Sequence, residues 1–83
     1  MNEILDMTEM GKLAQGLVIK QIPFQVIPMF NGLQILCKDW DAICHSGSYG
    51  HSEGLLEIYG SIVQSEYDDV EGYLTAEEIL ERL

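Results

Sequence analysis

Four residues have side chains that could bind a soft metal ion or carry out nucleophilic chemistry: Cys37, Cys44, His45 and His51. Four such ligands could fill a tetrahedral zinc site. Zinc sites usually place their ligands in close pairs, whereas six residues separate these two cysteines. Adjacent residues of a strand point to opposite faces, so Cys44 and His45 cannot easily bind one ion. The spacing therefore favours packed cysteines with a surface histidine, and we predict no metal site.

A cysteine nucleophile would need a histidine base, His45 or His51, and an acid such as Glu53. Reactive thiols lie near positive charge or a helix N-terminus, because both stabilise the thiolate. A cysteine on a strand of an acidic protein has neither. We therefore predict that the protein is not an enzyme, that it has no catalytic residue and that it needs no cofactor.

Residues 46–52, which are rich in glycine and in hydroxyl-bearing residues, are predicted to form a loop that leads toward a predicted helix. The start of a helix can bind anions through its free N–H groups. However, the loop lacks the lysine and the G-x-x-x-x-G-K-[ST] pattern of a phosphate-binding loop. Two interpretations remain: a plain connection that uses Gly47 and Gly50 to turn, or a site for a small ligand.

Residues 67–78 resemble the calcium-binding loop of the EF-hand family. The matching positions are two acids, the turn glycine, an aliphatic residue and the closing glutamate, namely Asp69, Glu71, Gly72, Leu74 and Glu78. The first position departs from the family, because Tyr67 stands where an aspartate ligand is expected. The resemblance implies a weakened calcium site, whereas an acidic loop before a capped helix explains the same residues without a metal.

The charge of the chain is concentrated near its C-terminus. The formal net charge is −10, from 14 acidic and 4 basic residues. Residues 1–52 contain five acids and three lysines, whereas residues 53–83 contain nine acids and one arginine. Phosphate groups require a basic surface, so this composition argues against direct binding to nucleic acid or to an anionic membrane.

The leading hypothesis is a non-enzymatic interaction protein that docks a basic surface of a larger partner. Charge alone suggests a phage or mobile-element accessory protein, including an inhibitor that presents carboxylates where phosphates would lie. The predicted partner-binding residues are acids and tyrosines of the C-terminal third: Glu66, Tyr67, Asp68, Asp69, Glu71, Tyr73, Glu77 and Glu81. The alternatives are an acidic surface that only provides solubility, and a small domain that binds a ligand or metal through residues 46–52 or 67–78.

The hydrophobic pattern predicts an α+β fold in which helices cover a small antiparallel sheet, with the order α-β-β-(β)-α-α. Asn31-Gly32 favours a hairpin turn between residues 24–30 and 33–39, which would place Val26 opposite Cys37. A short third strand follows over 42–45, with Cys44 opposite Cys37. Pro23 and Pro28 cannot donate to a sheet, so the first strand is predicted to be an edge or to have its proline at a bulge or a non-bonded position. As an edge it could pair with a second copy of the chain.

Three helices are predicted around these strands. The first spans residues 3–15, where Gly11 could break it and Gly16 is positioned to end it. The second begins near Ser52 and ends by about residue 65, because apolar residues recur at helical spacing; residues 66–74 are then irregular. The last begins at Thr75, where the sequence Thr-Ala-Glu-Glu predicts a capping box.

The length of 83 residues predicts a single domain over 1–83. The N-terminus has acids where a secretory signal would have lysines. The most apolar stretch, residues 17–30, is shorter than the roughly 20 residues of a membrane span. Two cysteines are too few for a disulfide scaffold, so we expect a cytoplasmic protein with free thiols.

Overall fold

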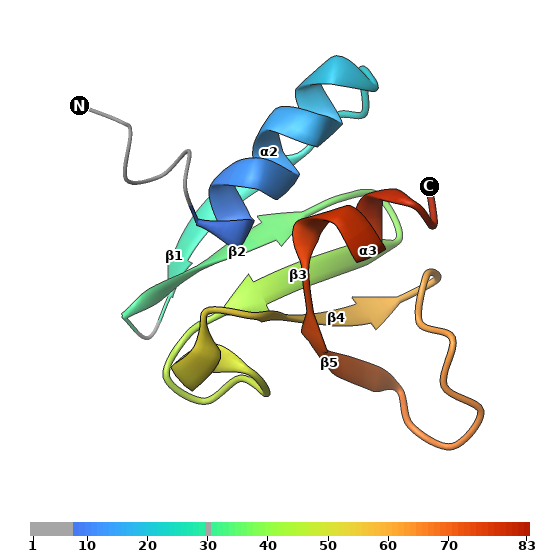
Figure 1. The fold of residues 1–83 in the computed structure, drawn as a ribbon. Coiled ribbons are helices and arrows are strands. Elements are labelled where there is room, and N and C mark those ends of the chain that lie inside the picture. Colours follow the sequence, from blue (N-terminus) through green and yellow to red (C-terminus); the bar gives the residue numbers. More distant parts are fainter. Residues whose placement is uncertain (1–7, 30) are drawn as a thin grey trace.

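The computed structural model describes residues 8–29 and 31–83 (Figure 1). Strands dominate the middle of the chain, and a helix lies near each end of the described part. The elements in chain order are α2 (Glu9–Ile19), β1 (Gln25–Met29), β2 (Gly32–Leu36), β3 (Trp40–Cys44), the short 3-10 helix η1 (His51–Glu53), β4 (Leu56–Gly60), β5 (Val70–Leu74) and α3 (Ala76–Leu80).

The five strands form one antiparallel sheet in which every strand pairs with its neighbour in sequence, in the order β1-β2-β3-β4-β5. The predicted α+β class is therefore confirmed, with more strands and fewer helices among the described residues than expected. The proline-containing first strand does lie at an edge, as predicted, because β1 pairs with β2 alone among the described strands. Its pairing with a second copy of the chain stays a prediction.

The first hairpin forms where predicted but in a different register. Met29 pairs with Gly32, so Gly32 belongs to the second strand and Asn31-Gly32 does not form the two-residue turn. Val26 consequently lies opposite Ile35 instead of Cys37. The shift of two residues leaves each side chain on its predicted face of the sheet. Gly32 is needed for another reason: a Cβ there would overlap the Cys44 carbonyl oxygen of β3.

The second hairpin corrects the predicted position of the cysteines. Leu33 pairs with Cys44 and Leu36 pairs with Asp41, while the Cys37 N–H donates to the Trp40 carbonyl over 2.9 Å. Residues 38 and 39 therefore form the connection, and the third strand begins at Trp40 instead of residue 42. The predicted pairing of Cys44 with Cys37 was wrong, and the two thiols lie at opposite ends of the hairpin.

The predicted helix over residues 52–65 is wrong. Only η1 is helical there, and residues 56–60 form β4. Leu56 and Ile58 are fully buried while the alternate residue Tyr59 is 54% exposed, which is the two-residue period of a strand. Gly54 and Gly60 flank the strand with positive φ angles. The expectation of irregular structure over 66–74 was likewise wrong for residues 70–74, which form β5.

The helix α2 ends at Ile19, later than the predicted end at residue 15. Thr8 caps α2 by accepting a hydrogen bond from the Gly11 N–H at 2.9 Å, and the helix continues past Gly11 and Gly16. The predicted residues 3–7 lie outside the described part. Gly16 does not end the helix but allows α3 to approach it, because a Cβ there would overlap the Leu80 side chain. Its small size therefore serves helix packing.

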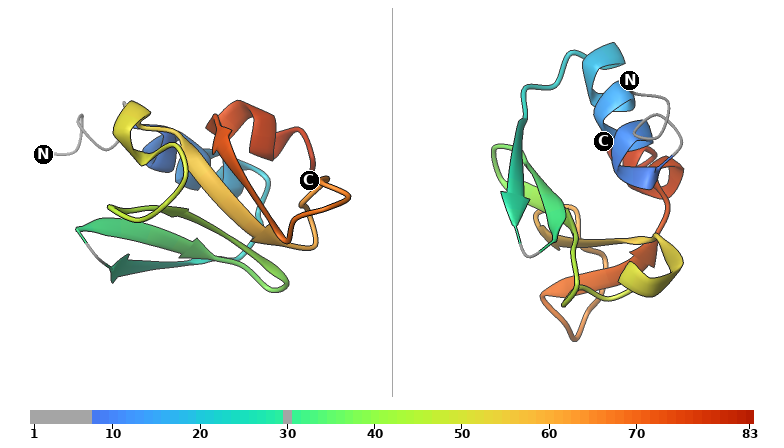
Figure 2. Two further views of the ribbon diagram at one scale, coloured as in Figure 1. Left: turned by 90° about the horizontal axis from the view of Figure 1, so that it is seen from below. Right: turned by 90° about the vertical axis from the view of Figure 1, so that its left-hand side faces the viewer.

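The hydrophobic core lies between the sheet and the two helices, which lie side by side on the same side of the sheet (Figure 2). Its fully buried large side chains come from both layers: Leu13, Leu17, Ile35, Leu56, Ile58 and Ile79. Each such side chain contributes about 1.5 to 3 kcal/mol when it leaves water. In the described part of the chain, neither helix is long and apolar enough to cross a membrane.

The predicted capping box of the last helix is confirmed. The Glu78 N–H donates to the Thr75 hydroxyl at 3.2 Å, and the Thr75 N–H donates to the Glu78 carboxylate at 2.8 Å. We expect Thr75→Ala to lower the free energy of unfolding by about 1 kcal/mol, measured by urea denaturation. Thr75→Ser keeps the hydroxyl and should retain most of that stability. An equal loss in both variants would contradict the capping role.

Candidate functional site

The connection between β4 and β5 presents the most exposed acidic cluster of the predicted site. Glu66, Asp68 and Asp69 are all exposed, and Tyr67 between them is 92% exposed. The Ser65 hydroxyl accepts hydrogen bonds from the N–H groups of Tyr67 and Asp68, at 3.3 and 3.1 Å. These bonds fold the segment into a turn. We call Glu66, Tyr67, Asp68 and Asp69 the acidic loop patch.

The acidic loop patch makes no ion pair with the described residues. The two salt bridges found there join Lys12 to Glu9 and Arg82 to Glu71. The three carboxylates of the patch therefore face solvent as uncompensated charges. A shallow hollow beside them is lined by Asp68, Asp69 and Tyr59, among others.

The helices cover one face of the sheet (Figure 2). Ile58 is fully buried and the adjacent Tyr59 is exposed, so Tyr59 belongs to the face that the helices leave uncovered. Cross-strand pairing places Leu36, Asp41 and Tyr59 in one row on that face. Leu36 is 38% exposed and Tyr59 is 54% exposed. The acidic loop patch thus borders a partly apolar surface, an arrangement that suits a protein interface with a charged rim.

Glu71, in contrast, is a structural residue. Its carboxylate accepts hydrogen bonds from both terminal nitrogens of Arg82, at 2.8 and 2.7 Å, and from the Gln64 N–H at 3.0 Å. The bonds to Arg82, followed by the bond to Gln64, lower the pKa of Glu71 to about 2. This carboxylate links β5 to the C-terminal end of the chain and is already occupied, which weighs against its predicted role in partner binding.

The other predicted partner-binding residues lie on different elements. Tyr73 is 56% exposed on β5, close to Gly50 of the loop before η1. Glu77 on α3 and Glu81 directly after it are exposed. They line a hollow together with Lys12 of α2 and Lys20 directly after α2. These lysines reduce the negative potential around the two glutamates. The predicted set is therefore divided between the acidic loop patch, β5 and α3.

The residues that resemble a calcium loop do not form one loop. Residues 70–74 are the strand β5, and the following helix begins at Ala76. Glu71 is held by Arg82, and Glu78 is held by Thr75. Within residues 8–29 and 31–83, no three His, Cys, Asp or Glu side chains gather as a metal site. The matched acids therefore do not converge on one point.

The four cysteine and histidine residues are split between two places. Cys44 Sγ lies 3.8 Å from His51 Nδ1, while His45 Nδ1 accepts a hydrogen bond from the Gly47 N–H at 3.0 Å. Burial raises the pKa of the Cys44 thiol; burial, followed by Asp39 and Asp41, raises that of Cys37. Neither thiol is activated. The sequence did not single out the Cys44 and His51 pair, because only the turn of residues 45–50 brings them together.

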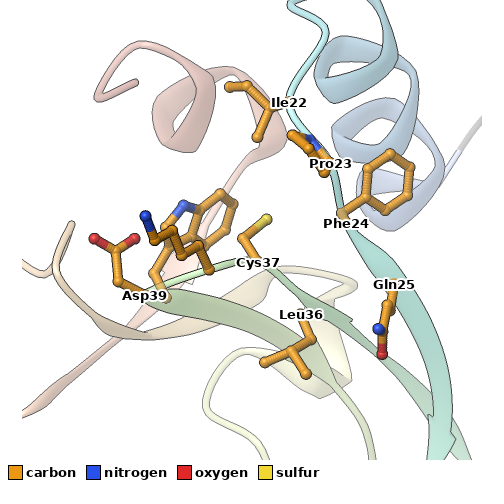
Figure 3. Close-up of a pocket in the computed structure, with 9 residues that line it drawn as sticks. Ile22, Pro23, Phe24, Gln25, Leu36, Cys37 and Asp39 are labelled. Carbon is orange, nitrogen blue, oxygen red and sulfur yellow. The ribbon is translucent and has the colours of Figure 1, made fainter.

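Cys37 instead lines an open, mostly apolar hollow of about 590 Å³ (Figure 3). Ile22, Pro23 and Phe24 contribute one wall from the connection between α2 and β1, and Leu36 and Cys37 contribute another from the end of β2 (Figure 3). Trp40, which also lines it, is nearly buried. The charged residues that line it are Lys38 and Asp39, which connect β2 to β3.

The described residues thus form a small α+β domain, in which two helices cover one face of a five-stranded antiparallel meander and an acidic turn projects beyond the sheet. Comparisons with protein-family models, with curated proteins and with solved structures found no match to the chain.

Proposed function

We propose that this protein is a non-enzymatic interaction protein that docks a basic surface of a larger partner through the acidic loop patch. The observation that carries the proposal is the exposure of Tyr67, at 92%, between carboxylates that form no ion pair with the described residues. Exposed carboxylates attract a basic surface over about one Debye length, roughly 8 Å at physiological salt. A tyrosine supplies apolar contact area and a hydrogen-bonding hydroxyl.

The outer face of the sheet extends this docking surface. Tyr59 and the acids Asp68 and Asp69 line one hollow, so a partner that covers the acidic loop patch would also reach the exposed ring of Tyr59. Charged rims mainly accelerate association and set the salt dependence, whereas buried aromatic contacts slow dissociation. The proposal assigns the first role to the carboxylates and the second to Tyr59 and Tyr67.

The most specific form of the proposal is a phage or mobile-element accessory protein that inhibits a nucleic-acid-binding partner. Its support is electrostatic: residues 53–83 combine nine acids with one arginine. Of these acids, Glu57, Glu71 and Glu78 accept hydrogen bonds within the domain. The others present negative charge to solvent, as phosphates do. Such charges would fit the surface of a basic partner that normally binds phosphates.

We expect neutralisation of the patch to weaken partner binding more than neutralisation elsewhere. The test variant combines Glu66→Gln, Asp68→Asn and Asp69→Asn. The control combines Glu53→Gln, Glu77→Gln and Glu81→Gln, which removes the same charge from other exposed positions. A partner captured from host lysate by the wild-type protein is purified, and its dissociation constant is measured for all three proteins at low and high salt.

The patch variant should bind at least about tenfold more weakly. It loses three charged contacts at the interface, and together these should contribute more than about 1.4 kcal/mol to the binding free energy, which corresponds to a tenfold change in the dissociation constant. The control variant should stay within about threefold of the wild type, and its salt dependence should be nearly unchanged. Equal weakening in both variants would mean that net charge, and not this surface, determines binding. A partner that binds both variants like the wild type would contradict the proposal altogether.

A further inference from the structure

Another hollow lies where the beginning of α2, the end of β1 and the end of β3 meet. Four of the residues that line it have sulfur or imidazole side chains: Met10, Met29, Cys44 and His51. We propose that Cys44 and His51, together with a methionine thioether of this hollow, bind a soft monovalent metal ion such as Cu(I). This inference is independent of the proposed partner binding.

The separation of the two strongest donors suits a shared ion. Cys44 Sγ and His51 Nδ1 are 3.8 Å apart, longer than a strong hydrogen bond. With metal bonds of about 2.0 Å to nitrogen and about 2.3 Å to sulfur, this separation corresponds to an angle of about 120° at the ion. That is the angle of three-coordinate geometry, which leaves room for one more ligand in the same plane.

The kinds of donor favour a soft ion over zinc. Thiolate and thioether ligands select Cu(I), whereas zinc is bound by thiolates, imidazoles and carboxylates, usually four of them. Among the described residues no third His, Cys, Asp or Glu joins Cys44 and His51. The additional sulfur donors in the hollow are the thioethers of Met10 and Met29, whereas Thr8 and Asn31 offer oxygen atoms, which suit harder ions. A soft metal that accepts thioethers therefore matches the sulfur-rich part of this set.

Local structure holds His51 beside the end of β3. The Ser48 hydroxyl accepts a hydrogen bond from the His45 N–H at 3.0 Å and donates to the His45 carbonyl at 2.9 Å, which closes the turn after the strand. Gly50 then adopts φ of +94° and reverses the chain immediately before His51. When the ion binds, it replaces the proton of the Cys44 thiol, which leaves to solvent, and no electron is transferred.

The experiment titrates the full chain with Cu(I) under anaerobic conditions, in competition with a chromogenic Cu(I) chelator. The wild-type protein should bind one equivalent. Loss of a residue that only hydrogen-bonds to a metal ligand lowers metal affinity by about 10- to 100-fold. Cys44→Ser and His51→Gln remove the ligands themselves, so each should weaken Cu(I) binding by at least this factor. Cys37→Ser and His45→Gln are the matched controls and should bind like the wild type. Circular dichroism verifies that each variant is folded.

The thioether ligand is tested by the double variant Met10→Leu and Met29→Leu, which keeps the apolar volume of the hollow nearly constant. Its affinity for Cu(I) should fall by about tenfold or more. Unchanged affinity would overturn three-coordinate binding. Two results would overturn the site itself: a folded Cys44→Ser variant that binds Cu(I) like the wild type, or loss of Cu(I) binding in Cys37→Ser. Binding of one equivalent of Zn(II) in place of Cu(I) would also overturn it.

Discussion

Replacing Gly60 by alanine is expected to lower the free energy of unfolding by about 3 kcal/mol or more, from two separate effects. Gly60 has φ of +115°, a conformation that residues with a side chain rarely adopt. A Cβ there would also lie 2.5 Å from the Asp39 carbonyl oxygen and 2.6 Å from Trp40 Cα. Both obstacles are backbone atoms of the neighbouring hairpin, so β3 and β4 would have to separate.

Two other glycines isolate these effects. Gly54 has φ of +73° but no atom within 4 Å of a Cβ, so Gly54→Ala should lower stability by only about 1 to 2 kcal/mol. A Cβ at Gly32 would overlap the Cys44 carbonyl oxygen and lie 2.6 Å from His45 Cα, in a conformation that is not left-handed. Gly32→Ala should therefore cost about 1 to 3 kcal/mol from overlap alone. Urea denaturation of the three variants measures the differences, and Gly60→Ala no more harmful than Gly54→Ala would refute the steric part.

These glycines also explain where the sequence misled the fold prediction. Residues 55–63 satisfy helical spacing through Leu55, Ile58 and Tyr59, yet Leu56 and Ile58 satisfy the period of a strand equally well. Hydrophobic periodicity alone does not separate the two. The deciding facts are the pairing of β4 with β3 and the positive φ of Gly60, and both depend on contacts with Asp39 and Trp40 that are distant in the chain.

Features that depend on neighbouring residues were predicted well. The capping box of Thr75 and Glu78 involves residues three apart, and the edge position of β1 follows from the missing N–H of Pro28. The register of the first hairpin failed because Gly32 is required by the backbone of β3 and not by the turn. A single sequence shows that a glycine is present but not which part of the chain approaches it.

The same limit applies to the candidate site. Glu66, Asp68 and Asp69 are exposed, as charged residues without partners usually are. Acidic composition could not show that Glu71 differs from these neighbours. That difference arises because β5 and the C-terminal end of the chain fold back on each other and place the Arg82 guanidinium against one carboxylate of the series.

The ion pair of Glu71 and Arg82 should make Glu71→Gln destabilising at neutral pH and harmless in strong acid. The variant loses a bidentate ionic contact with Arg82. Among the described residues, the partly buried Arg82 guanidinium then keeps its hydrogen bond to the Ile62 carbonyl, at 3.1 Å. Hydrogen bonds to charged groups contribute about 1.5 to 3 kcal/mol, and the remaining exposure of the Glu71 side chain, 26%, favours the lower end. We expect a loss of about 1 to 2 kcal/mol at pH 7.

The direction of the pH effect follows from the lowered pKa. The ion pair with Arg82 holds the pKa of Glu71 at about 2 in the folded protein, below its ordinary value of 4.5. Between these values the unfolded chain binds more protons at this position, so the stabilisation is complete above pH 4.5 and is lost as the pH falls toward 2.

Acidification also relieves repulsion among the other acids of a chain with net charge −10, so the informative quantity is the stability difference between wild type and variant. That difference should disappear near pH 2, whereas Glu66→Gln should show little difference at any pH. A difference between wild type and Glu71→Gln that persists unchanged at pH 2 would show that the glutamine disturbs packing and that the ionic contact is not the source of stability.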